Sequence, residues 1–203
     1  NLEIISDIDL DVLKLNNPFL LKNIFPDIKE EFILKSQKIK LNYKKDTLSI
    51  AGSGDVILQN EIDKIDYEII KKNNELKFKS KLKILRNPFK INFINFTKNK
   101  NYDLELDFAG KISDVGNLLF NRIYLNEKNK TITINNLVLS NNKIDDIGNV
   151  KIDYIDDDGL QNNLELKKNN NDFLISGKSF NINKIIDDLL FSEKDKKLKL
   201  FNK

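Results

Sequence analysis

Four residue types are missing from this chain of 203 residues: cysteine, histidine, methionine and tryptophan. Without cysteine there is no disulfide framework, and without cysteine or histidine there is no structural zinc site, no thiol nucleophile and no imidazole to activate a serine. The composition therefore predicts no metal, no cofactor and no enzyme. Because no methionine opens the chain, we also expect it to be an internal piece of a longer protein.

Arginine is nearly absent as well, since Arg86 and Arg122 are the only two, and the net charge is just +3. Arginine is the side chain suited to bidentate recognition of phosphates and bases, so its scarcity argues against a nucleic-acid partner. No apolar run approaches the ~18 residues of a membrane span, and no signal segment opens the chain. Any targeting or anchoring segment is expected outside residues 1–203.

What the chain has in abundance is strict alternation of apolar and polar residues. Between Glu75 and Ile84, leucine, phenylalanine and isoleucine occupy one parity and Glu75 and lysines the other. Because successive strand side chains point to opposite faces, this pattern predicts a sheet with one apolar and one charged face. Asp103, Glu105 and Asp107 make the polar parity of a later segment acidic, so we expect charge pairs across the sheet.

Strand candidates follow one another at short intervals, with polar turns such as Lys44-Lys45-Asp46 between them. This rhythm predicts a mainly β, antiparallel meander in a single segment over residues 1–203. The apolar parity switches at Phe93-Ile94 and at Asn135-Asn136, as a β-bulge requires. Short helices are expected within residues 17–32 and, from three- and four-residue apolar spacing, near residues 182–191.

Candidate chemical sites are weak. Gly52-Ser53-Gly54 lacks the lysine and the further glycine of a phosphate-binding loop, so a turn or bulge is the better interpretation. The turn from Asp156 to Gly159 imitates a calcium loop only in part, since Tyr154 stands where its first carboxylate belongs. Asp145-Asp146 and Asp187-Asp188 are adjacent acidic pairs, which on a surface are normally just solvated.

Two runs near the end of the chain carry a resemblance. Residues 174–180, Leu-Ile-Ser-Gly-Lys-Ser-Phe, and the following Ile185-Ile186-Asp187-Asp188-Leu189-Leu190 resemble a recurring element of bacterial AsmA-like proteins, especially the YhdP type. Residues 48–54 and 87–91 are also similar to pieces of those repeats. The resemblance implies an extended, curved antiparallel β-groove, part of a repeat protein that is anchored in the inner membrane and lies in the periplasm.

In that family the groove shields phospholipid acyl chains between the inner and outer membranes, so the resemblance implies lipid transport in outer membrane biogenesis. The expected partners are acyl chains, neighbouring repeats of the same chain and, through other regions, the membrane. The alternative is a structural β-sandwich or solenoid domain of an envelope or surface scaffold, with its apolar rows closed by a second sheet. The residues predicted to line a lipid groove come from the segments with the cleanest alternation: Leu76, Phe78, Leu82, Ile84, Ile91, Phe93, Leu104, Leu106 and Phe108.

Overall fold

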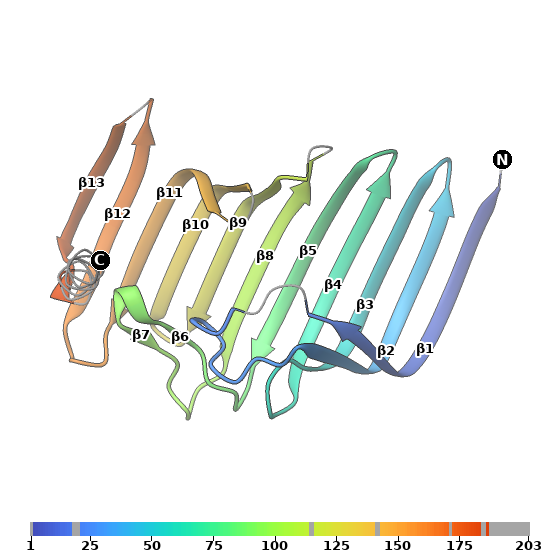
Figure 1. Ribbon diagram of the computed structural model, residues 1–203, viewed down its shortest axis with the longest axis horizontal. Helices are drawn as coiled ribbons and strands as arrows, with labels where there is room; N and C mark the ends of the chain where they lie inside the picture. Colours follow the sequence, from blue (N-terminus) through green and yellow to red (C-terminus); the bar gives the residue numbers. More distant parts are fainter. Residues whose placement is uncertain are drawn as a thin grey trace, which may run out of the picture.

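The computed structural model describes residues 2–17, 21–113, 116–140, 143–170, 172–183 and 186. One antiparallel sheet of eleven strands dominates the fold, and each strand pairs with the next along the chain except that β6 and β7 form a separate small hairpin (Figure 1). The predicted antiparallel meander is therefore confirmed. The elements are β1 (Glu3–Asn16), β2 (Glu31–Lys44), β3 (Thr47–Ile57), β4 (Asp63–Lys72), β5 (Glu75–Ile84), β6 (Lys90–Ile91), the 3-10 helix η1 (Asn92–Ile94), β7 (Phe96–Thr97), β8 (Leu104–Ile112), β9 (Leu118–Glu127), β10 (Lys130–Ser140), β11 (Lys143–Ile155), β12 (Gln161–Asn169) and β13 (Asp172–Ser179).

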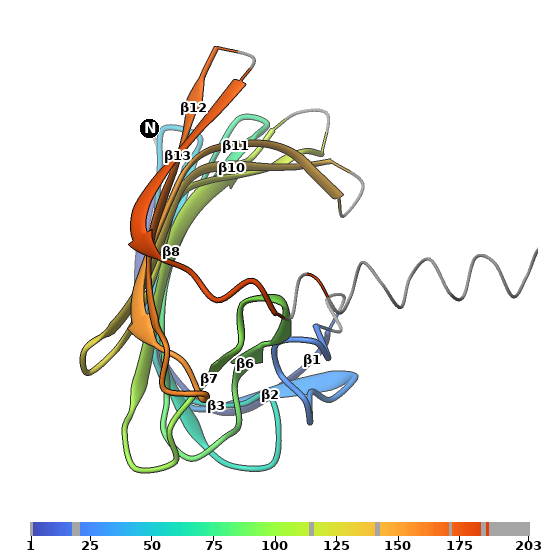
Figure 2. The same cartoon turned by 90° about the vertical axis from the view of Figure 1, so that its left-hand side faces the viewer.

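The sheet is bent into an open trough. Figure 2, seen from the β13 side, shows the strands curving along their length, with residues 21–30 and the β6–β7 hairpin on the concave side near one end of the strands. We call that end the lower end and the opposite end the upper end. The expected curved β-sheet is thus present, and it does not close on itself.

Irregularities in the strands accompany this bend. Asn136 has a left-handed φ of 54°, and the apolar parity of β10 switches there from Ile134 to Leu137, as predicted from the sequence, although β10 keeps its register with β9 and β11 across this residue. The register of β10 with β11 shifts between Val138 and Leu139. Ser36 in β2, with a φ of 49°, lies at a second irregularity, where the pairing of β2 with β3 shifts register. In both places the switch keeps apolar side chains on the concave face while the strand turns.

The glycines of β3 do not interrupt the strand, although a tight turn or a bulge was predicted at Gly52-Ser53-Gly54. β3 runs through Gly52 and Gly54 in continuous register with β4. Side chains from neighbouring strands explain both glycines: a Cβ on Gly52 would lie 2.3 Å from the Tyr67 ring, and one on Gly54 would lie 2.4 Å from Gln37 Nε2. The bulge falls on the facing strand β2 instead.

The segment around Phe93 also differs from its prediction. Its alternation predicted a strand with a bulge at Phe93-Ile94, but the chain forms the two-residue β6 and then η1, which ends at Asn95 in the left-handed conformation with a φ of 52°. The alternation arises because Phe89, Ile94 and Phe96 pack onto the concave face of the large sheet, rather than within it.

Helix is scarce in the described part of the chain. Residues 21–30 form turns, not the short helices expected within residues 17–32. The helix expected at residues 182–191 lies almost entirely outside the described residues, although the Ile186 N–H does donate to the Ile182 carbonyl at 3.0 Å. The 3-10 helix η1 is the one complete helix within the described residues.

The buried core occupies the lower part of the trough. There the segments that connect the strands pack onto the sheet as a cap. Successive aromatic rings contact each other edge to face within it, from Phe25 to Phe89, Phe96 and Tyr154, with centroid distances of 5.3, 6.2 and 5.3 Å. Ile84 and Leu104 beneath this cap are fully buried. We call residues 21–30 and 85–103 the cap.

Candidate functional site: an open apolar trough

The concave face is built from cross-strand rows of apolar side chains. Residues directly opposite one another in paired strands share a face, so the strand registers define each row. The row nearest the upper end, which we call the rim row, is Ile4, Tyr43, Leu48, Lys71, Leu76, Ile112, Leu118, Leu139 and Ile144. The next, the upper row, is Ser6, Leu41, Ile50, Ile69, Phe78, Gly110, Phe120, Leu137 and Ile147.

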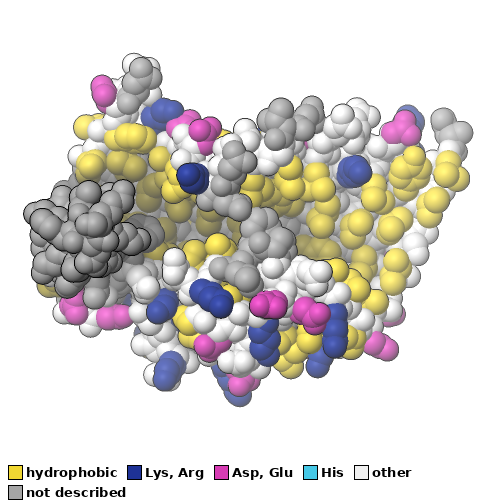
Figure 3. Space-filling model, in the orientation of Figure 1, with side chains coloured by type: hydrophobic (Ala, Val, Ile, Leu, Met, Phe, Trp, Pro, Cys, Tyr) yellow, Lys and Arg dark blue, Asp and Glu magenta, His cyan; other side chains and the backbone are white. Residues whose placement is uncertain are grey.

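Two further rows lead down to the cap. The middle row is Ile8, Ile39, Gly52, Tyr67, Ser80, Phe108, Ile123, Ile134, Val150, Leu166 and Ile175. The lower row is Gly54, Ile65, Leu82, Leu106, Leu125, Ile132, Ile152, Leu164 and Gly177. Figure 3 looks into the trough and shows hydrophobic side chains across its floor from one side of the molecule to the other.

Three phenylalanines stand in the middle of this floor. Phe78 and Phe120 contact each other edge to face at 5.7 Å, and Phe108 lies 6.3 Å from each of them. All three rings are only half-buried, and none belongs to the core beneath the cap. They form an apolar surface that protein side chains leave partly uncovered.

The predicted groove residues divide between the open trough and the capped core. Leu76, Phe78, Leu106 and Phe108 are half-buried on the concave face, Leu106 at the border of the core. Leu82, Ile84 and Leu104 are buried under the cap, and Ile91 belongs to the cap itself. The side chain of Phe93 lies outside the described residues. Sequence reasoning missed the contributions of every strand except β5 and β8, although alternation had marked most of them as strands, and it did not identify β9 as a strand at all.

The cap is attached by buried polar side chains at the lower ends of the strands. Asn87, with 1% of its surface exposed, donates to the Glu61 carbonyl and to Asp63 Oδ2 at 2.7 Å each and accepts the Glu61 N–H at 3.0 Å. Asp63 Oδ1 accepts the Leu85 N–H at 2.9 Å, and Gln59 Nε2 donates to the Pro88 carbonyl at 2.9 Å. These bonds hold one side of residues 85–103 against β4.

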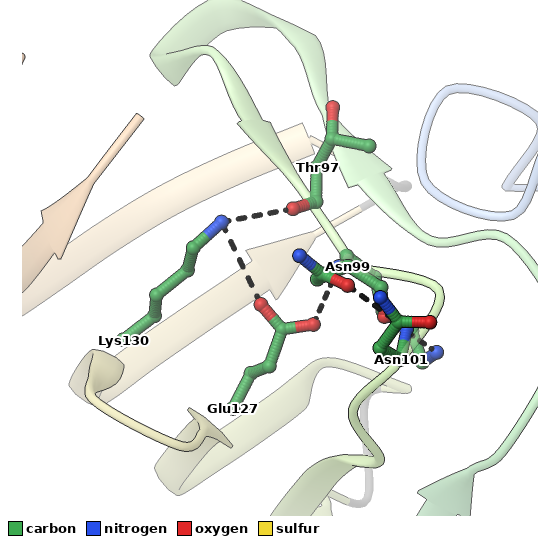
Figure 4. Close-up of polar contacts among 6 residues, drawn as sticks. Thr97, Asn99, Asn101, Glu127 and Lys130 are labelled. Atoms are coloured by element: carbon green, nitrogen blue, oxygen red, sulfur yellow. Dashed lines mark hydrogen bonds and ion pairs between the residues drawn. The ribbon is translucent and has the colours of Figure 1, made fainter. Parts of the chain in front are cut away.

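A second anchor holds the other side of the cap to the β9–β10 hairpin (Figure 4). Glu127 Oε1 accepts the Asn99 N–H at 2.6 Å, while Lys130 Nζ donates to the Thr97 carbonyl at 3.2 Å and lies 3.6 Å from Glu127 Oε2. Burial raises the pKa of Glu127 above its ordinary value, against the lowering effects of the Asn99 N–H and of Lys130 and Lys98. The cap therefore closes the lower end of the trough, and the upper end is left open.

In the turn from Asp156 to Gly159, which imitates a calcium loop, the Asp156 carboxylate accepts hydrogen bonds from four groups. Asp156 Oδ1 accepts the N–H groups of Asp158 and Leu160, and Oδ2 accepts the amides of Asn162 and Asn181. Burial alone raises the pKa of Asp156, but these hydrogen bonds outweigh it and hold the pKa below its ordinary value. Within the described residues no group of three or more acidic, histidine or cysteine side chains is placed to hold a metal ion.

The outer face carries the predicted charge pairs. β5 lies beside β8, and Lys81 bonds Glu105 and Lys83 bonds Asp103, each at 2.9 Å. A cavity of about 1010 Å³ crosses the middle of β1–β5 and β8, lined mainly by side chains of this polar parity. Its charged lining contains as many acidic as basic groups: Asp7, Asp9, Asp66, Glu68 and Asp107 against Lys38, Lys40, Lys79, Lys81 and Arg122. This balance favours no ligand of one charge.

Two further findings bear on identity. No helix in the described ranges is long and apolar enough to cross a membrane. Comparison of the chain with protein-family models, with curated proteins and with solved structures finds no match.

Proposed function

We propose that this chain is a lipid-carrying groove segment in which acyl chains lie along the concave apolar face of the sheet. The observation that carries the proposal is the open trough itself, whose floor includes the half-buried ring cluster of Phe78, Phe108 and Phe120. Large contiguous apolar surfaces are rare on soluble monomers unless they bind something. Each acyl methylene that leaves water for this surface contributes about 0.8 kcal/mol.

The resemblance to AsmA-like proteins supports the same function. On that basis we propose a periplasmic segment of a longer repeat protein that is anchored to the inner membrane elsewhere and that passes phospholipids toward the outer membrane. The chain's own residues perform no covalent chemistry in this proposal. They exclude water from the acyl chains, while the charged outer face keeps the sheet soluble.

The alternative is a structural β-domain whose apolar face is covered by another protein. It is favoured by the free edges at β1 and β13, where main-chain groups have no strand partner among the described residues. Within the described chain, the cap covers only the lower part of the trough, and no second sheet larger than the β6–β7 hairpin packs on it. A closed sandwich would therefore need a partner.

Substitutions on the two parts of the concave face test the proposal. Phe78→Glu places a carboxylate in the open trough, where its head can reach water, so we expect a folded variant that no longer binds lipid. Leu104→Glu places the same group at a fully buried position, and a buried unpaired charge costs several kcal/mol, so we expect that variant to unfold. Thr133→Glu, on the outer face of β10, should change neither property.

The measurements are thermal melting, mass spectrometry of lipid that co-purifies with the protein, and binding of a fluorescent fatty acid such as cis-parinaric acid. As a check that does not depend on the stability of Phe78→Glu, a photo-crosslinking residue at Phe108 should capture acyl chains, and one at Tyr124 on the outer face should not. A folded wild-type protein that carries no lipid, binds no fluorescent fatty acid and forms no acyl adduct at position 108 would rule the proposal out.

A further inference from the structure

Lys71 is the charged member of the rim row. It lies directly between Leu48 of β3 and Leu76 of β5, and its cross-strand neighbours on both sides point to the concave face. The rest of the row, from Ile4 on β1 to Ile144 on β11, consists of aliphatic residues and Tyr43. A lysine thus interrupts an otherwise apolar row at the open end of the trough.

Several other charges near the sheet have partners, and lysines to which the described residues offer no ion pair, such as Lys38, Lys40 and Lys79, lie on the outer face. Lys81 and Lys83 on the outer face pair with carboxylates of the neighbouring β8 segment. Asp63 and Glu127, at the lower end of the concave face, are buried and hold the cap. The Lys71 side chain is exposed, and no carboxylate of the described residues lies within ion-pair distance of its ammonium. The fold gives this ammonium no evident structural role.

The position of Lys71 suits an amphiphile lying in the trough. Its aliphatic stem can pack along Leu48 and Leu76 while the ammonium reaches toward water at the upper rim. The cap covers the lower end of the strands, so the upper rim is the uncovered strand end at which the polar end of a bound amphiphile can reach water. A polar end that projects over this rim meets the ammonium.

We propose that Lys71 contacts the anionic headgroup of the lipid, a phosphate or a carboxylate attached to the acyl chain. The inference rests on the proposed lipid-carrying function and adds to it the orientation and charge class of the ligand: tails toward the Phe78 ring cluster, negative headgroup at the β3–β5 end of the rim. An ion pair at an exposed rim contributes about 1 kcal/mol, or about fivefold in affinity, and weakens with added salt.

Three ligands with the same sixteen-carbon chain separate the headgroup contribution from the chain contribution. They are palmitoyl lysophosphatidic acid, palmitate and the uncharged monopalmitoylglycerol. The affinity of each is measured by displacement of cis-parinaric acid, with every ligand kept below its own critical micellar concentration. Lys71→Gln should weaken lysophosphatidic acid, palmitate or both by about fivefold at low salt and leave monopalmitoylglycerol unchanged. Loss with lysophosphatidic acid alone identifies a phosphate site, and loss with palmitate alone a carboxylate site.

Two controls sharpen the comparison. Lys79→Gln removes a lysine from the outer face of the same strand pair and should change no affinity. The exchange variant Leu48→Lys with Lys71→Leu moves the ammonium one strand along the rim row and should restore the preference for anionic ligands.

The outcomes distinguish the two proposals. Equal affinities of wild type and Lys71→Gln for all three ligands would overturn the role of Lys71 and leave the lipid groove standing. A wild-type protein that binds none of the three would overturn the groove, and the headgroup assignment with it.

Discussion

Glu127 and Asp63 are buried carboxylates, and one oxygen of each accepts a backbone N–H of the cap. Burial raises the pKa of both above the ordinary value, Asp63 in spite of the Leu85 N–H, Asn87 and Lys98. Burial also lowers the pKa of Lys98, whose ammonium donates to the carbonyls of Leu85 at 2.8 Å and Asn99 at 3.2 Å. These groups position the cap at some electrostatic cost.

The raised pKa of Glu127 gives a prediction for pH. A carboxyl whose pKa is higher in the folded state contributes its stability fully below its unfolded pKa of 4.5, and this contribution is lost as pH rises through the folded pKa. Wild-type protein should therefore lose stability from this group as pH rises above 4.5 and through the folded-state pKa. Glu127→Gln keeps the acceptor for the Asn99 N–H. In this variant the unfolding free energy should depend less on pH between 4.5 and 7.5, as measured by urea unfolding.

Glu75 is the matched control for this measurement. Hydrogen bonds from Lys77 and Lys111 hold the pKa of its exposed carboxyl below the ordinary value, so its contribution is present above pH 4.5 and is lost as pH falls below that. Glu75→Gln should leave the slope between pH 4.5 and 7.5 unchanged. If Glu127→Gln also left the slope of unfolding free energy against pH unchanged, the buried Glu127 carboxylate would not be its cause.

At the scale of elements, the cap converts one end of an open sheet into a folded core. The strands alone cannot bury Ile84 and Leu104. The cap residues Phe89, Ile94 and Phe96 cover these two side chains, because buried amides and carboxylates hold residues 85–103 in place. The cap also fixes which end of the trough stays open. Both the stability of the sheet and the direction in which a ligand can protrude therefore depend on the cap's attachment.

Asn87 is the cap residue whose removal should cost most. Asn87→Ala leaves the Glu61 carbonyl, the Glu61 N–H and Asp63 Oδ2 without their partner, so we expect a loss of about 2–4 kcal/mol of unfolding free energy. Asn60→Ala, which removes one exposed contact to Asp27, should cost less than about 0.5 kcal/mol. Chemical denaturation measures both, and equal effects would contradict the anchoring role.

For the whole molecule, the defining property is a sheet that stays open on its concave face and at both edges. Both edges expose apolar side chains, among them Ile5 of β1 by 71% and Leu174 of β13 by 60%. The edges differ in charge: β1 carries Glu3, Asp7, Asp9, Asp11 and Lys14 along its length, whereas Phe173, Leu174 and Ile175 of β13 follow one another with no charge between them. Charged side chains blunt an edge against pairing with other chains, and an apolar edge invites it. Self-association through β13 is therefore favoured over association through β1.

We expect association that grows with concentration and that a charge on β13 suppresses. Leu174→Lys should shift the sedimentation profile toward monomer, while Ile5→Lys on the outer face of β1 should have a smaller effect. Analytical ultracentrifugation from micromolar to submillimolar protein makes the comparison. A wild-type protein that remains monomeric over this range in the absence of lipid and detergent would show that β13 is protected.

The local sequence determined the strands of the large sheet other than β9, their antiparallel order, the outer charge pairs and the parity switch at Asn136, because a two-residue period and turn residues such as Lys45 and Asp46 act over a few positions. It misassigned Phe89 to Phe96, because alternation looks the same whether a segment joins a sheet or packs on top of one. Only the tertiary structure decided that Gly52 lies inside a strand, since that depends on Tyr67 from the next strand.

The candidate site divides in the same way. Alternation identified Leu76, Phe78, Leu106 and Phe108 as members of the apolar face, but it also selected Leu82, Ile84 and Leu104, which the cap buries. The position of Lys71 among leucines is visible only once the strand registers place Leu48 and Leu76 beside it. Periodicity assigns a residue to a face of its own strand, whereas coverage of that face and its cross-strand neighbours are set by contacts between distant segments.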